Sequence, residues 1–386
     1  MKFTCDGKLL AQVLAKMVKL ATRKASASAG AELLQLVASA AGLVRLTVAH
    51  GGTKLTAGVP AIVDSPGLSG VSATALTELC RAMAPLGLPV QCEVSEMDRQ
   101  MRIASGPVEQ VLETMAAEEA VSPDSDDGEE LETVRVPGRC LKLALDRLAP
   151  ILAAMGQPGA PDAVACDVDA DGRVMLAATD TTRLAMVGLE EAQVQSAAPL
   201  PQAWNLKSTD IQLLSALLNG DAAGAEGQLI LKTTGWTATW SHYQFTSLYS
   251  ERAFPNWRAI WPRAYTNTLE VDGKEFGAIL RLLAKVADPK RAAVKFQWNG
   301  EREALLAAGN RDAGTETAVA LGLEWKTRQA APGSSLTMSA KLLEPIVKKL
   351  EAGPVLFSFT APSQPARVRP ADAAEAVEYL VMPINL

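Results

Sequence analysis

The chain has 386 residues, which is too long for one ordinary hydrophobic core and enough for two or three domains. Its hydrophobic content of 48% and net charge of −6 are typical of a globular protein, and no apolar run approaches the roughly 20 residues that span a bilayer. The first residues lack the long apolar segment of a secretory signal. The five cysteines show no Cys-x-x-Cys spacing, so we expect reduced core residues in a cytoplasmic protein.

The chain repeats one pattern three times. Residues that alternate as in a strand lead into a turn at Gly7, Gly138 and Gly273, and a segment with apolar residues at helical spacing follows each turn. These glycines lie 131 and 135 residues apart, about the length of one small domain. We predict first helices over 8–24, 138–156 and 273–291, and second helices over 73–87, 206–220 and 340–352.

The remainder of each repeat is rich in short alternating segments. In chain order we predict strands over 42–50, 55–63, 90–94, 100–104, 164–168, 173–179, 183–189, 229–233, 236–240, 243–248 and 378–382. Each repeat is therefore a βαβββ-type unit with an antiparallel sheet, and the fold class is α+β. The predicted domains are 1–117, 133–262 and 263–386, with an acidic linker over 118–132.

Charge is distributed unevenly along the chain. The six predicted helices contain 18 basic and 7 acidic residues, whereas the other 288 residues contain 19 basic and 36 acidic ones. This distribution indicates that positive charge is concentrated on one surface, as in proteins that bind nucleic acid. The alternative interpretation is an ordinary solvated face on each helix.

Motifs for catalysis and cofactor binding are absent from the sequence. His50 and His242 are the only histidines and lack the spacing of a metal site. No Gly-rich phosphate-binding motif and no activated-nucleophile motif occurs, and the acidic run at 124–130 lacks the pattern of a calcium loop. We therefore predict a binding protein without catalytic residues, metal or cofactor. An enzyme on a repeated α+β fold is the less favoured alternative.

Three segments carry a family resemblance: LAATDTTRLA at 176–185, AFPNWRAIWP at 253–262, and the final YLVMPINL at 379–386. Together with three repeats over this length, they make the chain similar to the bacterial sliding clamp family, the beta subunit of DNA polymerase III. The resemblance implies a DNA clamp fold that closes as a head-to-tail homodimeric ring of six domains. Such a ring encircles duplex DNA without reading its sequence and acts as a processivity factor for the polymerase.

The resemblance also implies two sets of site residues. Partners of the family, among them the DNA polymerase III alpha subunit and the clamp loader, bind through a short peptide with Leu and Phe anchors, in a pocket between the second and third repeats. In this sequence that pocket is formed by Thr179, Thr181, Arg183, Leu184, Pro255, Ile260, Leu380, Met382 and Pro383. The residues expected to face DNA are Lys8, Lys16, Lys19, Arg23, Lys24, Arg139, Lys142, Arg147, Lys207, Lys274, Arg281, Lys285 and Lys341.

The sequence departs from the family pattern at several positions. Thr181 and Thr182 stand where the family usually has Gly-His, Asn385 replaces a basic residue, and the loop 156–162 lacks basic and aromatic residues. Without the resemblance, the pocket residues read as a sheet edge and a C-terminal strand in ordinary core packing. A clamp-like scaffold that recruits partners without being loaded for replication is therefore the alternative function.

Overall fold

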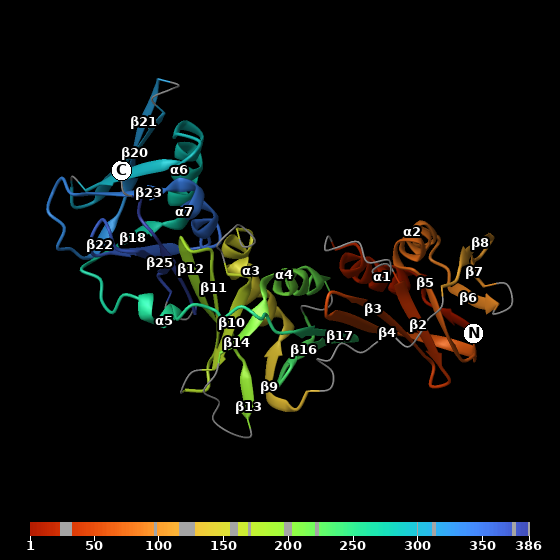
Figure 1. The fold of residues 1–386 in the computed structure, drawn as a ribbon. Coiled ribbons are helices and arrows are strands. Elements are labelled where there is room, and N and C mark those ends of the chain that lie inside the picture. The colour runs from red at the N-terminus through yellow and green to blue at the C-terminus, as the bar shows by residue number, and fades with distance from the viewer. Residues whose placement is uncertain are drawn as a thin grey trace. The chain divides into compact units, whose positions relative to one another are not determined.

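The computed structural model describes residues 1–23, 33–95, 99–115, 128–154, 161–168, 171–196, 203–220, 224–298, 300–310, 314–372 and 376–384 (Figure 1). The chain forms two compact units. Unit 1 contains Met1–Lys142, Glu191–Leu200 and Thr209–Tyr249, and unit 2 contains Leu143–Glu190, Pro201–Ser208 and Ser250–Leu386. The α+β class with antiparallel sheets is confirmed. The predicted second repeat contributes to both units, and the boundaries at 117, 132 and 262 stay predictions.

Unit 1 is built on one large antiparallel sheet. Among the described residues its path runs β13-β9-β15-β16-β17-β4-β1-β6-β7-β8, and off this path β3 pairs with β4, β2 with β3, and β5 with β2. The long strand β4 pairs with β17 through its first half and with β1 through its second half, so the sheet is continuous from the first repeat into the second. Its strands are β1 Lys2–Cys5, β2 Leu33–Ser39, β3 Leu43–His50, β4 Thr53–Ser65, β5 Gly67–Ser72, β6 Val90–Ser95, β7 Gln100–Ser105, β8 Val108–Glu113, β9 Glu130–Pro137, β13 Gln193–Ser196, β15 Glu226–Lys232, β16 Gly235–Trp240 and β17 Tyr243–Leu248.

Unit 2 contains two antiparallel sheets. The larger has the order β14-β10-β11-β12-β26-β25-β24-β18-β22, and the smaller has the order β21-β20-β19-β23. Phe296 stacks on Phe357 at 5.7 Å, and Phe276 meets both rings edge-on, so aromatic packing joins the two sheets to a helix. The strands are β10 Ala163–Val168, β11 Val174–Thr179, β12 Arg183–Gly188, β14 Trp204–Lys207, β18 Asn267–Asp272, β19 Ala293–Gln297, β20 Glu303–Asn310, β21 Thr315–Gly322, β22 Glu324–Thr327, β23 Ser335–Ser339, β24 Pro354–Phe359, β25 Ala366–Pro370 and β26 Val377–Val381.

The six predicted helices are all present, but each ends earlier than expected. They are α1 Gly7–Ala21, α2 Ala73–Met83, α3 Gly138–Leu152, α4 Ser208–Leu217, α6 Gly273–Val286 and α7 Ala340–Val347, with a short α5 at Trp257–Ile260 and a 3-10 turn at Ala84–Leu86. α4 starts at Ser208 because the preceding residues form β14. Most of the predicted linker lies outside the described residues, and its last three residues belong to β9.

The same Asp-Gly pair begins α1 and α6, which shows the repeat in atomic detail. Asp6 caps α1 by accepting from the Leu9 backbone N–H at 2.7 Å, and Asp272 caps α6 in the same way from Glu275 at 2.8 Å. The next residue is a glycine in both, and a Cβ there would lie 2.7 Å from the Leu88 carbonyl in α1, or 2.6 Å from the Gly353 carbonyl in α6. The Asp-Gly pair therefore performs the same two tasks in both copies: a helix cap and a close backbone approach.

The predicted apolar faces point into the core. Leu10, Val13, Leu14 and Met17 of α1 are all buried, and Phe276, Ile279, Leu280 and Leu283 of α6 are buried in the same way. α1 packs on α2, where the Thr77 hydroxyl donates to the Leu14 carbonyl at 3.4 Å. The opposite faces of α1 and α6 are the ones that carry the basic residues.

Candidate protein-binding and nucleic-acid-binding surfaces

The turn between β11 and β12 is held by one aspartate. Asp180 Oδ1 accepts from the Thr182 N–H at 3.0 Å, the Thr182 hydroxyl at 2.8 Å and the Arg183 N–H at 2.7 Å. Asp180 Oδ2 pairs with the Arg183 guanidinium through Nε at 2.8 Å and Nη2 at 2.6 Å. Both side chains are about 5% exposed. Sequence reasoning selected Arg183 and missed Asp180, although an acid three residues before an arginine in a turn was a usable signal.

Thr181 occupies the tip of this turn in a left-handed conformation, with φ at 76°. β-branched residues rarely adopt this region, which is typical of glycine. The strained residue is held by Thr179, whose hydroxyl accepts from the Thr181 N–H at 3.1 Å and donates to the Arg183 carbonyl at 2.6 Å. Thr181 and Thr182 are exposed, so the turn presents two threonines to solvent.

The C-terminal strand lies beside this turn. β26 pairs with β12 so that Leu184 is opposite Leu380, and the Met382 N–H donates to the Thr182 carbonyl at 2.9 Å. Leu184 and Leu380 are buried in a cluster with Ala165, Ala177 and Trp257. These two leucines therefore belong to the core beneath the surface.

Solvent reaches a different subset of the predicted pocket residues. The side chains of Met382 and Ile260 are 41% and 56% exposed, Pro255 is exposed, and Pro383 is half-buried. All nine predicted residues lie in unit 2. Pro255, Ile260 and Met382 form an exposed apolar rim, Leu184 and Leu380 belong to a buried floor, and Thr181 is exposed but polar. Sequence reasoning missed the part of the floor made by Trp257 and its half-buried neighbours Phe254, Trp261 and Tyr265.

Polar contacts fix the elements around this rim. Arg183 Nη1 donates to the Leu342 carbonyl in α7 at 3.2 Å. In α5, Arg258 forms an ion pair with Asp167 and lies 4.3 Å from the centroid of the Trp257 ring. The rim is thus preorganised by contacts to β10 and α7, which is a favourable property for a binding surface.

The basic residues predicted to face DNA fall into two groups. In unit 1, the Lys16 and Lys19 ammonium groups each donate at 3.2 Å to carbonyls at the end of α4, on Asn219 and Ala216. These contacts place positive charge at the negative end of the α4 dipole. Arg23 forms an ion pair with Asp210, so the end of the α1 stripe is bound within unit 1.

Asp210 is the centre of a buried polar cluster. It is fully buried and, besides Arg23, accepts hydrogen bonds from the hydroxyls of Thr53 in β4 and Ser247 in β17. The cluster joins α4, β4, β17 and the segment after α1. This aspartate was not predicted, because its partners are distant in the sequence.

Other predicted basic residues are also paired with acids. Arg139 pairs with Glu191 at 2.6 Å and the buried Arg147 with Glu190 at 2.9 Å. Arg281 pairs with Glu351 and Glu344, and the hydrogen bond to Glu351 raises the pKa of Arg281.

Four further lysines predicted to face DNA have other environments. Lys341 donates to the Pro289 carbonyl at 2.5 Å, Lys142 and Lys207 are half-buried, and Lys24 lies outside the described residues.

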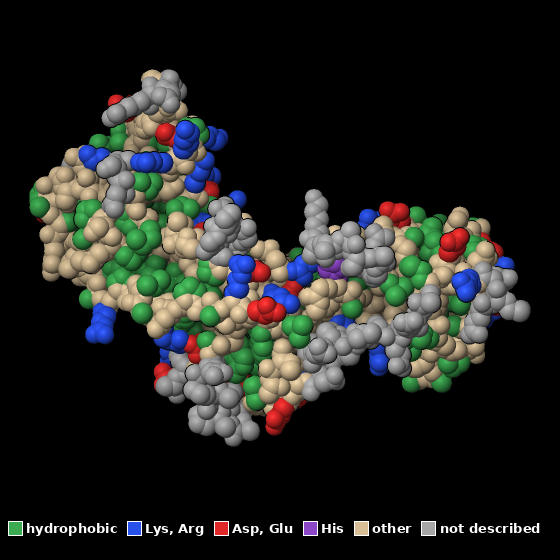
Figure 2. All heavy atoms as spheres, viewed as in Figure 1, with side chains coloured by type: hydrophobic (Ala, Val, Ile, Leu, Met, Phe, Trp, Pro, Cys, Tyr) green, Lys and Arg blue, Asp and Glu red, His purple; other side chains and the backbone are tan. Residues whose placement is uncertain are grey.

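Three lysines remain as exposed charges. Within the described part of the chain, Lys8 in α1 and Lys274 and Lys285 in α6 are exposed and form no ion pair. Figure 2 shows Lys and Arg side chains gathered over α6 in unit 2. These lysines are the strongest candidates for contacts to phosphate.

Groups for chemistry are not assembled in the described residues. No cluster of His, Cys, Asp and Glu there could hold a metal ion. All five cysteines are buried and none forms a disulfide, and burial raises the pKa of Cys5 and Cys80 to about 12, which keeps these thiols protonated. No helix of the described structure is long and apolar enough to cross a membrane.

Comparison with known proteins gives the fold its name. No protein-family model matches the chain. A DNA polymerase sliding clamp from Pseudomonas aeruginosa superposes with a TM-score of 0.85 at 21% identity, over 100% of both chains. The chain has the sliding clamp fold. The DNA polymerase III subunit beta of Borrelia burgdorferi superposes equally well, with a TM-score of 0.85 at 11% identity and full coverage of both chains.

Sequence similarity to clamps is weaker and partial. The beta sliding clamp of Synechococcus elongatus is 26% identical over 231 residues, which is 57% of this chain and 56% of the relative. The matched part thus spans just over half the length of that curated relative. A further Pseudomonas aeruginosa clamp structure, with a TM-score of 0.87 at 21% identity over 100% of both chains, contains bound griselimycin. The predicted clamp fold is confirmed over the full chain.

Proposed function

We propose that the chain is a DNA sliding clamp, a non-catalytic processivity factor that encircles duplex DNA and tethers a DNA polymerase. The observation that carries the proposal is the clamp fold, since a Pseudomonas aeruginosa clamp superposes with a TM-score of 0.85 over 100% of both chains. The uneven charge distribution adds to it, because the helices are basic on an acidic body. Its partners are then duplex DNA, the polymerase III alpha subunit and a clamp loader, in the cytoplasm.

The encircling mode has a topological test. The protein is loaded onto nicked circular DNA by a clamp loader, and its retention is compared before and after the circle is linearised. A ring slides off free ends, so we expect retention on the circle and loss from the linear form. Equal retention on both forms would contradict encircling.

Ring closure is supported by two open sheet edges. β8 is the terminal strand of the unit 1 sheet and exposes Val111, while β21 is the terminal strand of the smaller unit 2 sheet. Pairing of two different edges is a heterologous contact, which closes into a ring when the rotation between copies permits it. We propose that two copies form this ring. Light scattering should therefore give twice the mass of one chain. Val111→Asp in β8 should shift this mass toward the monomer.

Phosphate contacts are assigned to the exposed lysines. Lys8, Lys274 and Lys285 are the residues to reverse, because Lys16, Lys19 and Arg23 also hold unit 1 together. Each lost phosphate contact lowers the slope of log affinity against log salt by about 0.9. Reversal of all three to Glu should weaken DNA binding and flatten that slope, whereas Lys295→Glu on β19 should change neither.

Partner recognition is assigned to the apolar rim of unit 2. Met382 and Ile260 are exposed large apolar residues above a preorganised floor, which suits the anchors of a short peptide. We expect Met382→Ala to weaken a Gln-Leu-x-Leu-Phe peptide about tenfold, because one apolar anchor contact contributes about 1–2 kcal/mol. Leu282→Ala, which truncates a similarly exposed apolar residue in α6, is the matched control and should bind normally.

A second candidate function is a clamp-like scaffold that recruits partners without being loaded. It is favoured by one observation: several predicted DNA contacts, among them Arg23, Arg139, Arg147 and Arg281, are paired with acids of the chain itself. A scaffold should bind the peptide with normal affinity yet fail to remain on circular DNA. Retention on circles rejects this alternative.

A further inference from the structure

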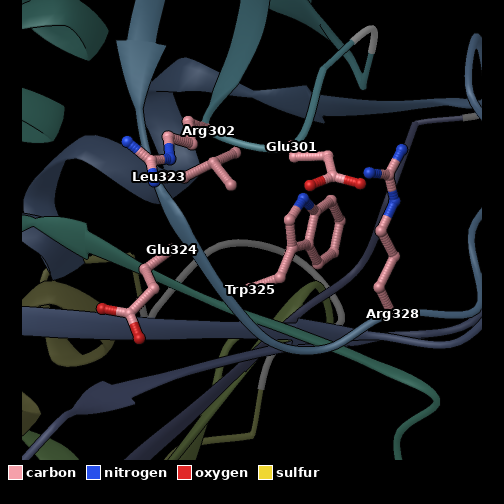
Figure 3. Close-up of a pocket in the computed structure, with 6 residues that line it drawn as sticks. All are labelled: Glu301, Arg302, Leu323, Glu324, Trp325 and Arg328. Atoms are coloured by element: carbon pink, nitrogen blue, oxygen red, sulfur yellow. The ribbon is translucent and has the colours of Figure 1, made fainter.

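An open cavity of about 620 Å³ lies at one edge of unit 2 (Figure 3). It is bounded by β22, the terminal strand of the larger sheet, and by the segment before β20. Its volume falls within the range of sites for small ligands. The residues that line it are Glu301, Arg302, Leu323, Glu324, Trp325 and Arg328.

Arg328 is held rigidly at the cavity with one donor unused. Its guanidinium lies 4.9 Å from the centroid of the Trp325 ring, Nε donates to the Ala330 carbonyl at 3.2 Å, and Nη1 donates to the Gly300 carbonyl at 3.1 Å. Ala330 is itself fixed, since its N–H donates to Asn267 Oδ1 at 2.7 Å. The remaining nitrogen, Nη2, is buried and has no hydrogen-bond partner among the described residues.

Trp325 supplies a second unused donor. Its indole Nε1 is buried and forms no hydrogen bond within the described chain. The ring is fixed on one side by Arg328 and on another by Trp298, which it meets edge-on at 5.7 Å. A buried donor without a partner is unfavourable, and two of them on stacked side chains form a site for an acceptor.

The position of Glu301 indicates which kind of acceptor suits the two donors, Trp325 Nε1 and Arg328 Nη2. In Figure 3 its carboxylate points toward the Trp325 indole and toward Arg328. It nevertheless forms neither a hydrogen bond nor an ion pair with them, and the residue is exposed. Glu324, the other acid at the cavity, is paired with Lys326 at 3.0 Å. Glu301 is therefore a carboxylate of the chain at the entrance to two donors that it does not satisfy.

We propose that this cavity binds the carboxylate of a ligand at Trp325 Nε1 and Arg328 Nη2, after the Glu301 side chain rotates outward. The carboxylate belongs to a free organic acid or to the C-terminus of a peptide, and its apolar body packs on Leu323 and the Trp325 ring. Phosphate is disfavoured, because Glu301 and Glu324 repel a dianion more strongly than a monoanion. The site is separate from the rim around Met382 and does not depend on the proposed clamp function.

The experiment follows the indole N–H signals of the ¹⁵N-labelled full-length chain by nuclear magnetic resonance. Trp325→Phe removes one signal and so assigns it. The probes are N-acetyl-leucine, its amide N-acetyl-leucinamide, and inorganic phosphate, at constant ionic strength. We expect the acid to move the Trp325 signal in a saturable manner. The amide should bind at least about tenfold more weakly, because it lacks the charge for a charge-assisted hydrogen bond. Phosphate should also bind at least about tenfold more weakly, because Glu301 and Glu324 repel its higher charge.

Three variants test the roles of the side chains. Arg328→Lys should weaken the acid about tenfold, since lysine lacks the planar fork. Glu301→Gln should strengthen binding about threefold or more by removing the competing charge, and it leaves the packing of the cavity intact. Glu324→Gln is the matched control and should change affinity less than about twofold.

Peptides then separate the two sources of the carboxylate. If Ala-Ala-Leu with a free C-terminus binds more tightly than N-acetyl-leucine, the ligand is a peptide end; if the two bind equally, it is a free acid. Either result supports the site. Equal shifts by acid and amide, tighter binding of phosphate, no saturable shift by the acid, or normal affinity in both the Arg328 and Glu301 variants would overturn it.

Discussion

Two buried aspartates, Asp180 and Asp210, are each paired with an arginine, but they are built in different ways. All the donors to Asp180 come from Thr182 and Arg183, within three residues along the chain. The donors to Asp210 come from Arg23, Thr53 and Ser247 on three other segments of unit 1. The first aspartate shapes one turn, whereas the second connects elements whose pairing defines the unit. Removal of Asp210 should therefore cost more.

The largest expected effect is that of Asp210→Ala. The change leaves the Arg23 charge without its acid and the buried Thr53 hydroxyl without its acceptor, and loss of one partner of a buried pair costs about 3–5 kcal/mol. Urea denaturation of the variant should show this loss. The double variant with Arg23→Ala should be less destabilised than the sum of the two single variants. Additive effects would show that the cluster does not act as a unit.

Asp180→Ala comes next. The turn loses the acceptor for two backbone N–H groups and the acid paired with Arg183. We expect a loss of about 2 kcal/mol in the same measurement, because Arg183 keeps its hydrogen bond to the Leu342 carbonyl. The rim should also lose order, so peptide binding at Met382 should weaken in parallel. A loss larger than that of the Asp210 variant would reverse the comparison between local and long-range aspartates.

Thr181→Gly should have the opposite sign. Glycine adopts the left-handed conformation of the turn without strain, so we expect a gain of about 1 kcal/mol in unfolding free energy. The neighbouring Thr182→Gly is the control: its hydroxyl is bound to Asp180 and its φ is not positive, so it should destabilise. If both variants change stability equally, strain at Thr181 is not the cause.

A third buried acid, Glu132, gives the smallest effect and the one that depends on pH. It is buried in β9, its Oε2 has no hydrogen-bond partner in the described structure, and burial raises the pKa of its carboxyl. The folded state therefore holds this proton more tightly than the unfolded state, and stability falls as pH rises above the ordinary Glu pKa. Glu132→Gln should gain roughly 0.5 kcal/mol at neutral pH. The gain should vanish near pH 3, where both states are protonated; an equal gain at both pH values would contradict this origin.

Local features of the fold could be predicted from the sequence. The Asp-Gly starts of α1 and α6, the apolar faces of these helices and most strands follow from spacing within a few residues. The predicted helices extend too far at their C-terminal ends, because neighbouring strands and turns determine where each helix stops. The pairing of β4 with β17 could not be predicted, since register over such a distance depends on the complete sheet.

The site residues divide in the same way. Resemblance assigned nine residues to one pocket, but it could not show that Leu184 and Leu380 are core or that Trp257 packs against them. The count of charged residues identified the basic helices, but the charge of a residue does not reveal which acid it pairs with in the fold. Arg23 and Arg281 were therefore predicted to face DNA, whereas in the structure each forms an ion pair with an acid of the chain. No sequence motif predicts the Trp325 cavity, because its two donors stand out only by their lack of a hydrogen-bond acceptor in the folded structure.

The pairing of strands far apart in the sequence has a consequence for the nascent chain. Tyr243 in β17 pairs with Ala57 in β4, and Leu380 in β26 pairs with Leu184 in β12. Synthesis proceeds at about 5–20 residues per second, so β4 and β12 are each made roughly 10–40 s before the strand that pairs with them. During that interval β4 and β12 expose unpaired backbone edges, so neither unit can complete its sheet until its last strand has been translated.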